Sequence, residues 1–599
     1  MKKILMPGLL HFFITASAIF AVLLVSGNYK AEQIFSDPRI MTSFAVLLLV
    51  SLCLPLFFKR EFLKKYFIHA LILPVIWFAT FTWAYAFLEL PEKKHLGDYY
   101  TMIFLLFASS YIFFAGKTKI KDKTSLFASA YGLFSFFMIV VPAVYIAYYV
   151  IYHSEMDLFV LMAIFMTNAR EAFEFIETVV PLPYLVSTVA SVIIIFLFCF
   201  FFSHKIISSV IYKEPVFRGA SFKFRLFFAV IAILFVGGFI RQMMHVFPIS
   251  IYRAMNKGDG SYQILSTLRY NLERNSENIS IAKGETATEG THIIVIGESA
   301  NRDHMKVFSP SYGEETTPWE SSVSSSPDFF FFNRAYSNFS TTVMSLSYAL
   351  TSTRQYTDAS LKDAASLVDT ARAAGYHTDW ISFQNRSSLA TAGISAIGNR
   401  ADSSYWESGL DGDAVSVLKE LPPAAKRIIF IHINGSHYNY SSRVPVGFSD
   451  TASISPSDPY RDYDVTLVYT DQVLRDIFEY ASLYMNLKSM IYFSDHGEDM
   501  AYYHGTAPFT YDMTHIPLWI YLSPDYQAAH PELPSALRRN SGSIFTNDLI
   551  YDTASGIWQI RSNYYESLYD LSSPSYGLAD DEALTLHGTR FIKDDPSFK

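Results

Sequence analysis

Two adjacent side chains of metal-binding type follow one apolar run of the chain. The run at 489–493 has aromatic and β-branched character, and Asp495, His496 and Gly497 come directly after it. Such a run predicts a buried strand, and the carboxyl edge of an open α/β sheet is where its chemistry lies. Neighbouring strand residues point to opposite faces, so Asp495 and His496 can share an ion only if the chain turns there, which Gly497 permits. An acidic turn after a strand explains this stretch alone equally well.

The same design recurs almost two hundred residues upstream. The strand-like run at 292–296 leads into Glu298 and Ser299. Two carboxylates and an imidazole at the ends of two strands are more than an acidic turn requires. The repetition therefore favours a site that binds a metal ion.

A hydroxyl-rich segment supplies a candidate nucleophile. Ser340, Thr341 and Thr342 precede a helical pattern, so one threonine should lie at a helix N-terminus, where free N–H groups favour an oxyanion or a phosphate. A divalent ion on the same oxygen would lower its pKa and make it a nucleophile. A simple helix cap is the alternative, and from this segment alone it is the simpler interpretation.

Alternating strand and helix patterns place these side chains in an α/β domain over residues 291–599. They predict a mainly parallel sheet covered on both faces. The predicted strands are 292–296, 329–332, 377–382, 427–433 and 489–493, and the predicted helices are 342–350, 360–374, 465–484 and 547–557. Two further strands end in polar side chains, with Gln384 and Asn385 after one and His437 after the other.

The remainder of the chain is far more apolar. Of 599 residues 51% are hydrophobic, which indicates a membrane part joined to a polar part. Residues 1–248 form the predicted transmembrane domain, and 249–290 an interfacial connector and linker. Seven stretches have membrane-spanning length: 4–26, 40–58, 66–90, 99–116, 125–150, 184–202 and 226–247.

Charge gives the expected topology and excludes one class of partner. Lysines and arginines concentrate in the loops after the second, fourth and sixth stretches, which places the N-terminus in the cytoplasm and residues 291–599 outside it. The net charge of −8 gives no sign of nucleic-acid binding. Both cysteines, Cys53 and Cys199, lie in apolar stretches, so the polar domain cannot hold a disulfide.

One outer loop, between the fifth and sixth stretches, carries Thr167, Asn168 and Glu171. At the outer mouth of a helical bundle these groups could hold a lipid head group, and Glu171 would suit an ammonium. The start of an ordinary interfacial helix is the alternative, and the loop alone favours it.

The chain resembles the membrane-bound phosphoethanolamine transferases of Gram-negative bacteria, in the alkaline phosphatase and sulfatase superfamily. The matching motifs cover most of residues 291–520 in family order. They are Ile296–Ser299 with Arg302, His304 and Met305; Tyr312-Gly313; Thr316–Pro318; the Thr342 segment; Gly435–His437; Tyr469–Asp471; Ser494–Glu498; Tyr503–Gly505; and His515–Pro517.

This resemblance implies a sulfatase-like catalytic domain in the periplasm, anchored in the inner membrane by a multi-pass helical domain. It implies that Glu298, Thr342, Asp495 and His496 bind zinc. Thr342, with Thr341 as the fallback, would attack phosphatidylethanolamine and form a phosphoethanolamine-threonine intermediate.

It also implies roles for residues around these four. His437 and His504 would contact the phosphoryl group or move protons, and Asn385 would line the donor pocket. Thr167, Asn168 and Glu171 would hold the ethanolamine head group. The acceptor would be a hydroxyl or phosphate on lipopolysaccharide, a glucan or a protein.

Two departures from the family concern the membrane part and the acceptor. The family usually has five spans, so the first two of the seven could be an added hairpin. The domain has no cysteine, unlike members that modify lipid A, and is closer to the branch acting on core heptose, glucans or proteins.

Three other functions would explain parts of this pattern. A phosphoglycerol transferase of the same superfamily would share the layout but use phosphatidylglycerol. A sulfatase would need a Cys/Ser-x-Pro-x-Arg motif, which the Thr342 segment lacks. An inactive membrane scaffold would not need candidates at all four ligand positions.

Overall fold

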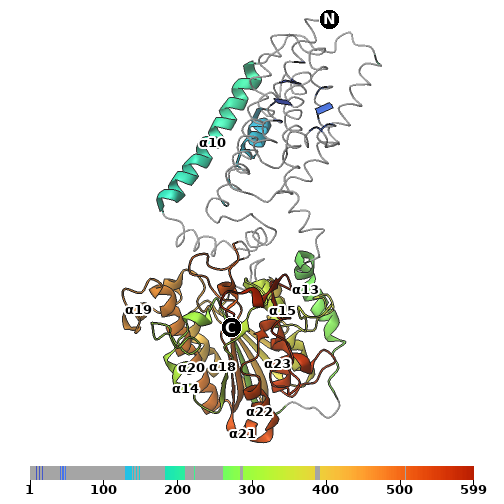
Figure 1. Cartoon of the computed structure of the whole chain (residues 1–599), viewed down its shortest axis with the longest axis vertical. Helices are drawn as coiled ribbons and strands as arrows, with labels where there is room; N and C mark the ends of the chain where they lie inside the picture. The colour runs from blue at the N-terminus through green and yellow to red at the C-terminus, as the bar shows by residue number, and fades with distance from the viewer. Residues whose placement is uncertain are drawn as a thin grey trace. The chain divides into compact units, whose positions relative to one another are not determined.

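The computed structural model describes residues 182–209, 261–282, 288–384, 392–505 and 508–598, with residue 222 and scattered positions between 9 and 148. The chain divides into two compact units. The C-terminal unit contains everything from Asp259 onwards and the N-terminal unit most of what precedes it. Figure 1 shows the whole chain.

The N-terminal unit contains one long apolar helix among the described residues, α10 (Leu182–Ser209). Its portion Leu185–Lys205 is long and apolar enough to cross a bilayer, and most of it is exposed. This portion coincides with the sixth predicted span. A shorter apolar helix, Ala128–Phe137, falls in the fifth, and Ser129 Oγ lies 3.2 Å from His204 Nε2 of α10. The other predicted spans lie wholly or largely outside the described residues.

The predicted connector is partly built into the C-terminal unit. It contains α13 (Ser261–Ser276), which packs against α17 (Ala392–Gly398). Leu268 and Leu272 are buried in this unit. The Asn275 amide donates to the carbonyl oxygens of Lys362 and Ala364, both at 2.9 Å. This compact unit therefore begins before residue 291.

The core of the C-terminal unit is a seven-stranded sheet with the order β2-β8-β7-β1-β6-β4-β5. Five adjacent strands are parallel, as predicted, whereas β8 is antiparallel to β7 and β2 is antiparallel to β8. The strands are β1 (Gly290–Gly297), β2 (Phe329–Phe331), β4 (His377–Ser382), β5 (Ser403–Trp406), β6 (Lys426–His432), β7 (Leu487–Ser494) and β8 (Leu518–Leu522). The sequence prediction missed β5 and β8.

Helices cover both faces of this sheet, because alternate residues of its central strands are apolar on both sides. Val295 and Tyr492 pack towards Leu474 of α20 (Arg461–Tyr484), with α14 (Pro318–Val323) and α18 (Ala414–Glu420) beside it. On the opposite face, Phe430 meets Trp558, which follows α23 (Ile550–Ile557). Figure 1 shows α14, α18 and α20 on one side of the strands and α15 (Thr342–Ala349) and α23 on the other.

Three predicted helices have different starts in the structure. In the predicted 360–374 helix, α16 (Leu367–Ala373) begins only after Ser366, whose side chain accepts the Asp369 N–H as an N-cap. In the 547–557 run, a 3₁₀ turn, η6 (Asn547–Leu549), precedes α23. The 465–484 pattern starts four residues earlier, as α20. Gly375 ends α16 as predicted, with φ at +94°.

Candidate active site

The two predicted ligand-bearing segments leave the sheet side by side. Strands β1 and β7 are parallel neighbours, and Gly297 is in register with Ser494. Glu298 and Asp495 therefore follow at the same edge. Ser299 takes φ of +55°, a strained conformation for a residue other than glycine, and its N–H donates to Asp495 Oδ1 at 3.1 Å. The backbone of one segment thus orients the carboxylate of the other.

Four side chains predicted as ligands lie together at this edge. Oγ1 of Thr342 is 3.2 Å from Glu298 Oε2 and 3.3 Å from His496 Nε2. The same nitrogen of His496 is 3.3 Å from Glu298 Oε1 and 3.4 Å from Asp495 Oδ2. Glu298, Asp495 and His496 also offer ligand atoms within 4.8 Å of one another. One small ion could therefore contact atoms from all four.

Thr342 reaches the group because it is the first residue of α15 (Thr342–Ala349). Thr341 is extended, with φ of −148°, and serves as the N-cap residue. The start of α15 is tied to the end of β7 by the Ser345 hydroxyl and the Asn547 amide, which donate to the Asp495 carbonyl oxygen at 2.6 and 2.8 Å. These bonds hold the threonine hydroxyl beside the carboxylates.

Gly497 is needed because it has no side chain, and not because it adopts a left-handed backbone conformation. Its φ is not among the positive ones, but a Cβ there would clash with the carbonyl oxygen of Asp512. Glycine therefore lets two backbone segments approach closely. Its carbonyl oxygen lies 2.9 Å from His496 Nδ1, so the proton on that nitrogen is held there and Nε2 faces Glu298 and Thr342.

The electrostatics of the group favour a cation. Burial raises the pKa of Asp495 to about 8, and the Glu298 charge adds to this. Burial opposes the charged form of His496, but Asp495 and Glu298 outweigh it and raise its pKa to about 10. Burial also disfavours the Glu298 charge, yet hydrogen bonding to His496 and its charge hold the pKa of Glu298 well below its ordinary range. The group therefore keeps protons on Asp495 and His496 when no cation is bound, and a metal ion would take the place of those protons.

A metal ion fits this donor set. Asp495 Oδ2 is buried without a hydrogen-bond partner, a costly state that a cation would relieve. Carboxylate oxygens, an imidazole nitrogen and a hydroxyl oxygen are ligands that zinc accepts in four-coordinate sites. Glu298, Asp495, His496 and Thr342 would hold it.

His437 lies on a loop pressed against Glu298. Gly435 has φ of +51°, and a Cβ there would come within 2.7 Å of the Glu298 carbonyl oxygen. Ser436 N–H donates to that oxygen at 2.9 Å. Asp411 accepts the N–H groups of Asn434 and Gly435, both at 2.8 Å, and so anchors the loop. Burial lowers the pKa of His437 to about 3.

His504 is the second predicted proton carrier, and its ring lies against two other histidines. The ring centroids of His504 and His437 are 5.7 Å apart, and those of His504 and His496 are 4.5 Å apart. The structure therefore brings both predicted proton carriers to the edge of the four-residue group.

Gln384 contributes a contact that the sequence did not assign. Its amide donates to Glu298 Oε2 and to the Ile433 carbonyl oxygen, both at 3.2 Å. Its place after a strand is the signal in the sequence, whereas the resemblance pointed to the neighbouring Asn385. Asn385 lies outside the described residues, as do Thr167, Asn168 and Glu171.

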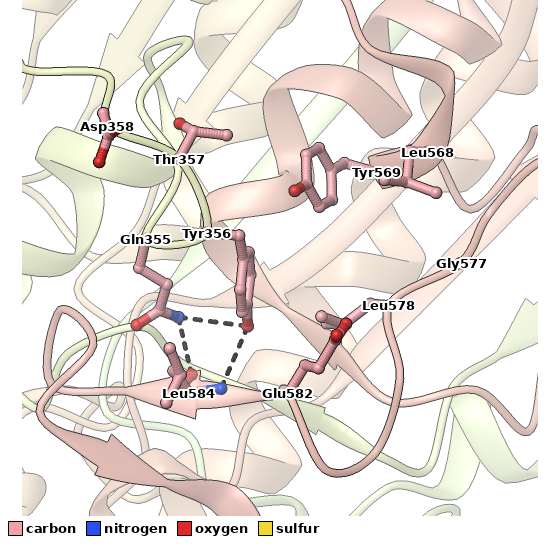
Figure 2. A pocket seen from close by; sticks show the side chains of 10 residues that line it. All are labelled: Gln355, Tyr356, Thr357, Asp358, Leu568, Tyr569, Gly577, Leu578, Glu582 and Leu584. Atoms are coloured by element: carbon pink, nitrogen blue, oxygen red, sulfur yellow. Dashed lines mark hydrogen bonds between the residues drawn. The ribbon is translucent and has the colours of Figure 1, made fainter.

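A separate pocket of about 560 Å³ contains none of these residues. Figure 2 shows it between the chain after α15 and the C-terminal segment, with Tyr356, Tyr569 and Glu582 among its lining. Gln355 closes one side by donating to the Leu584 carbonyl oxygen at 2.7 Å. Asp358 and Glu582 make this pocket acidic.

Comparisons with known proteins give a consistent picture. Residues 291–555 match the Sulfatase family model. The chain is 28% identical over 310 residues to the phosphoethanolamine transferase EptC of Escherichia coli (strain K12). This alignment covers 45% of this chain and 52% of the relative. It is 25% identical over 442 residues to the phosphoethanolamine transferase CptA of Salmonella typhimurium. This alignment covers 64% of this chain and 73% of the relative. The chain thus spans about half the length of the first of these relatives.

One solved structure shares the fold over most of the chain. The integral membrane protein lipooligosaccharide phosphoethanolamine transferase A (EptA) of Neisseria meningitidis aligns with a TM-score of 0.52 and 16% identity. The alignment covers 85% of this chain and 97% of that one.

Proposed function

We propose that this chain, whose residues 291–555 match the Sulfatase family model, is a metal-dependent phosphoethanolamine transferase of the alkaline phosphatase superfamily. It would take phosphoethanolamine from phosphatidylethanolamine and pass it to a hydroxyl or phosphate of an envelope acceptor. The observation that carries this proposal is the Thr342 hydroxyl, 3.2 Å from Glu298 Oε2 and 3.3 Å from His496 Nε2. The phosphoethanolamine transferases among its relatives support the choice of group.

In the first half-reaction, the oxygen of Thr342 bonds to the phosphorus of the lipid. The bond from phosphorus to the diacylglycerol oxygen breaks, and the proton lost by Thr342 is balanced by the one that diacylglycerol gains. His437 and His504, which lie beside the group, are the residues placed to carry that proton. In the second half-reaction, an acceptor oxygen loses its proton and bonds to phosphorus, and the threonine oxygen recovers a proton as it leaves.

Zinc would supply positive charge that stabilises the phosphoryl oxygens and lowers the pKa of the attacking hydroxyl. The residues of this chain position the reacting hydroxyl. Glu298 and His496 orient the threonine hydroxyl, and Gln384 holds the second oxygen of Glu298. Ser345 and Asn547 keep α15 attached to the end of β7.

The donor lipid requires a membrane location. We propose a multi-pass protein of the Gram-negative inner membrane with its catalytic domain in the periplasm, supported by the apolar α10 and by the fold shared with an integral membrane protein. Thr167, Asn168 and Glu171 would bind the ethanolamine head group, and Asn385 would line the donor pocket. Lipopolysaccharide, glucan and protein acceptors are all compatible with this scheme.

The test is a donor assay on the full-length protein in detergent. It is incubated with fluorescent phosphatidylethanolamine or, separately, fluorescent phosphatidylglycerol, and labelled diacylglycerol is measured. We expect release from phosphatidylethanolamine and a phosphoethanolamine mass increment on the peptide that contains Thr342. Release from phosphatidylglycerol alone would instead identify a phosphoglycerol transferase. Release from neither lipid would leave the inactive scaffold as the better description.

A further inference from the structure

We infer that Glu498 is a positioning residue that fixes the orientation and tautomer of His504, so that Nε2 of this histidine serves the reacting oxygens. The inference rests on the proposed phosphoryl transfer, because it assigns His504 its proton-carrying atom. Glu498 belongs to the motif that follows β7, but neither the four ligand positions nor the two proton carriers include it.

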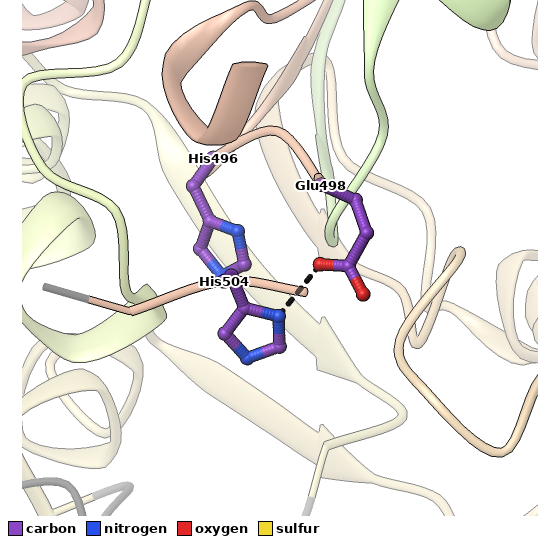
Figure 3. A group of neighbouring side chains, drawn as sticks. All are labelled: His496, Glu498 and His504. Carbon is purple, nitrogen blue, oxygen red and sulfur yellow. Dashed lines mark hydrogen bonds and ion pairs between the residues drawn. The ribbon is translucent and has the colours of Figure 1, made fainter. Parts of the chain in front are cut away.

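The contact itself is short and buried. Oε2 of Glu498 lies 2.7 Å from Nδ1 of His504, and the Glu498 side chain is fully buried. Figure 3 shows this contact, with His496 lying against the ring of His504. A carboxylate oxygen accepts and a ring N–H donates, so Nδ1 of His504 is the donor of this hydrogen bond. Nε2 is then the nitrogen of this ring that is left to take part in proton transfer.

A second donor keeps the carboxylate in place. The hydroxyl of Tyr440 donates to Glu498 Oε1 at 2.8 Å. The ring of Tyr440 packs edge-on against Tyr463, with centroids 5.2 Å apart. The side-chain amide of Asn301 donates to the Glu498 carbonyl oxygen at 2.9 Å. Segments that follow β1 and β6 therefore hold Glu498 from two sides.

A metal ion shared by His496, Glu498 and His504 is the competing explanation, because their ligand atoms lie within 4.8 Å of one another. The contacts oppose it. Each Glu498 oxygen already accepts a hydrogen bond, one from Tyr440 and one from His504. Both nitrogens of His496 are also committed, Nε2 towards Glu298 and Thr342 and Nδ1 towards the Gly497 carbonyl oxygen. An ion here would have to displace these partners.

The experiment compares full-length Glu498→Gln, His504→Ala and the double variant in the phosphatidylethanolamine assay. We expect Glu498→Gln to lower kcat for diacylglycerol release by about 10- to 100-fold, with KM changed less than about threefold. In the His504→Ala background, Glu498→Gln should cause no further loss of kcat, because Glu498 acts through His504. Tyr440→Phe should lower kcat as well, but by less. It tests the same contact if the Glu498→Gln variant does not fold.

Zinc content and a matched control separate the explanations. Glu582→Gln, the same change in the separate pocket, should leave diacylglycerol release unchanged. Zinc per chain should be equal in wild type and Glu498→Gln. Loss of zinc from Glu498→Gln, or a further rate loss in the His504→Ala background, would overturn the inference.

A substrate-free measurement keeps this inference distinct from the proposed function. ¹⁵N NMR of histidine-labelled full-length protein, with the His504 signals identified by their absence in His504→Ala, should show a protonated Nδ1 in the wild type. The signal should change in Glu498→Gln. If the wild type releases diacylglycerol from neither lipid, the proposed function fails, and this spectrum still decides whether Glu498 fixes the tautomer.

Discussion

Oγ1 of Thr342 lies 3.2 Å from Oε2 of Glu298, although Thr342 begins a helix and Glu298 follows a strand 44 residues earlier in the chain. The relationship joins a group able to become a nucleophile to a carboxylate whose negative charge is stabilised by His496. Neither a helix cap nor a strand-end turn requires that contact. It is the arrangement expected when both oxygens share one cation.

Replacement of Thr342 by alanine should abolish the first half-reaction, since it removes the hydroxyl that lies beside Glu298 and His496. We expect diacylglycerol release to fall by at least about 1000-fold, the scale seen when catalytic nucleophiles are removed. Thr341→Ala is the matched control, because it deletes the adjacent hydroxyl. It should retain release within about tenfold of wild type. The reverse ranking of the two variants would make Thr341 the nucleophile.

Asp495→Asn and Glu298→Gln should each lose zinc. Both substitutions preserve size but remove the negative charge that the ion balances, and Asp495 Oδ2 accepts no hydrogen bond within the protein. Wild-type protein should contain about one tightly held zinc per chain, measured by mass spectrometry of the metal after dialysis, and each variant much less. Asp358→Asn, at the acidic pocket, should keep the wild-type content. Equal zinc in all four proteins would contradict the assignment.

The sequence predicted the strands best where the apolar pattern of a run matches the buried position that the run takes in the fold. The strand at 377–382 is found with the same bounds, and β1, β6 and β7 differ from their predictions by a few residues, because buried parallel strands are continuous apolar runs. Glu298, Asp495 and His496 come together because parallel strands end at a common edge, and Thr342 joins them at the start of α15. Thr342 was distinguished from Thr341 by the resemblance, since either hydroxyl could begin the helix.

Other features depend on contacts that no local pattern reveals. Strand β5 is short and only half-buried, and β8 lies between β2 and β7, antiparallel to both. Gly497 was expected to permit a turn, yet its role is to make room for the backbone of Asp512. The hold of Glu498 on His504 involves Tyr440, which is 58 residues from Glu498. Such partners are known only once the chain is folded.

Arg354→Met should destabilise the C-terminal unit strongly. Arg354 and Asp552 form a buried ion pair, with their atoms 2.5 and 2.6 Å apart in two parallel hydrogen bonds. Removal of one partner leaves a buried, unpaired carboxylate, which typically costs about 3–5 kcal/mol of the free energy of unfolding. Arg334→Met is the control, because its partner Asp580 is half-exposed, and it should cost about 0–1 kcal/mol. Chemical denaturation monitored by tryptophan fluorescence gives both values.

Asp595→Asn should destabilise the protein in a pH-dependent way, because Asp595 is bound to the buried His515. The distance from Asp595 Oδ2 to His515 Nε2 is 2.7 Å. Burial opposes the carboxylate charge, but the hydrogen bond and charge of His515 outweigh it and lower the pKa of Asp595 to about 2. An unfolded aspartate titrates near about 3.9. Asp595 therefore contributes stability above about pH 4, and this contribution is lost as the pH falls towards 2.

Thermal unfolding of wild type and Asp595→Asn at several pH values measures this contribution. At pH 6 the variant should unfold at a lower temperature, consistent with a loss of about 1.5–3 kcal/mol for a hydrogen bond to a charged group. The gap in Tm should narrow as the pH falls from 4 to 2, because both proteins then lack the charge. Asp594 is the exposed neighbour of Asp595, and Asp594→Asn is the control. Its Tm should equal that of wild type at every pH. A gap of constant size across this range would mean that Asp595 acts through packing rather than through its charge.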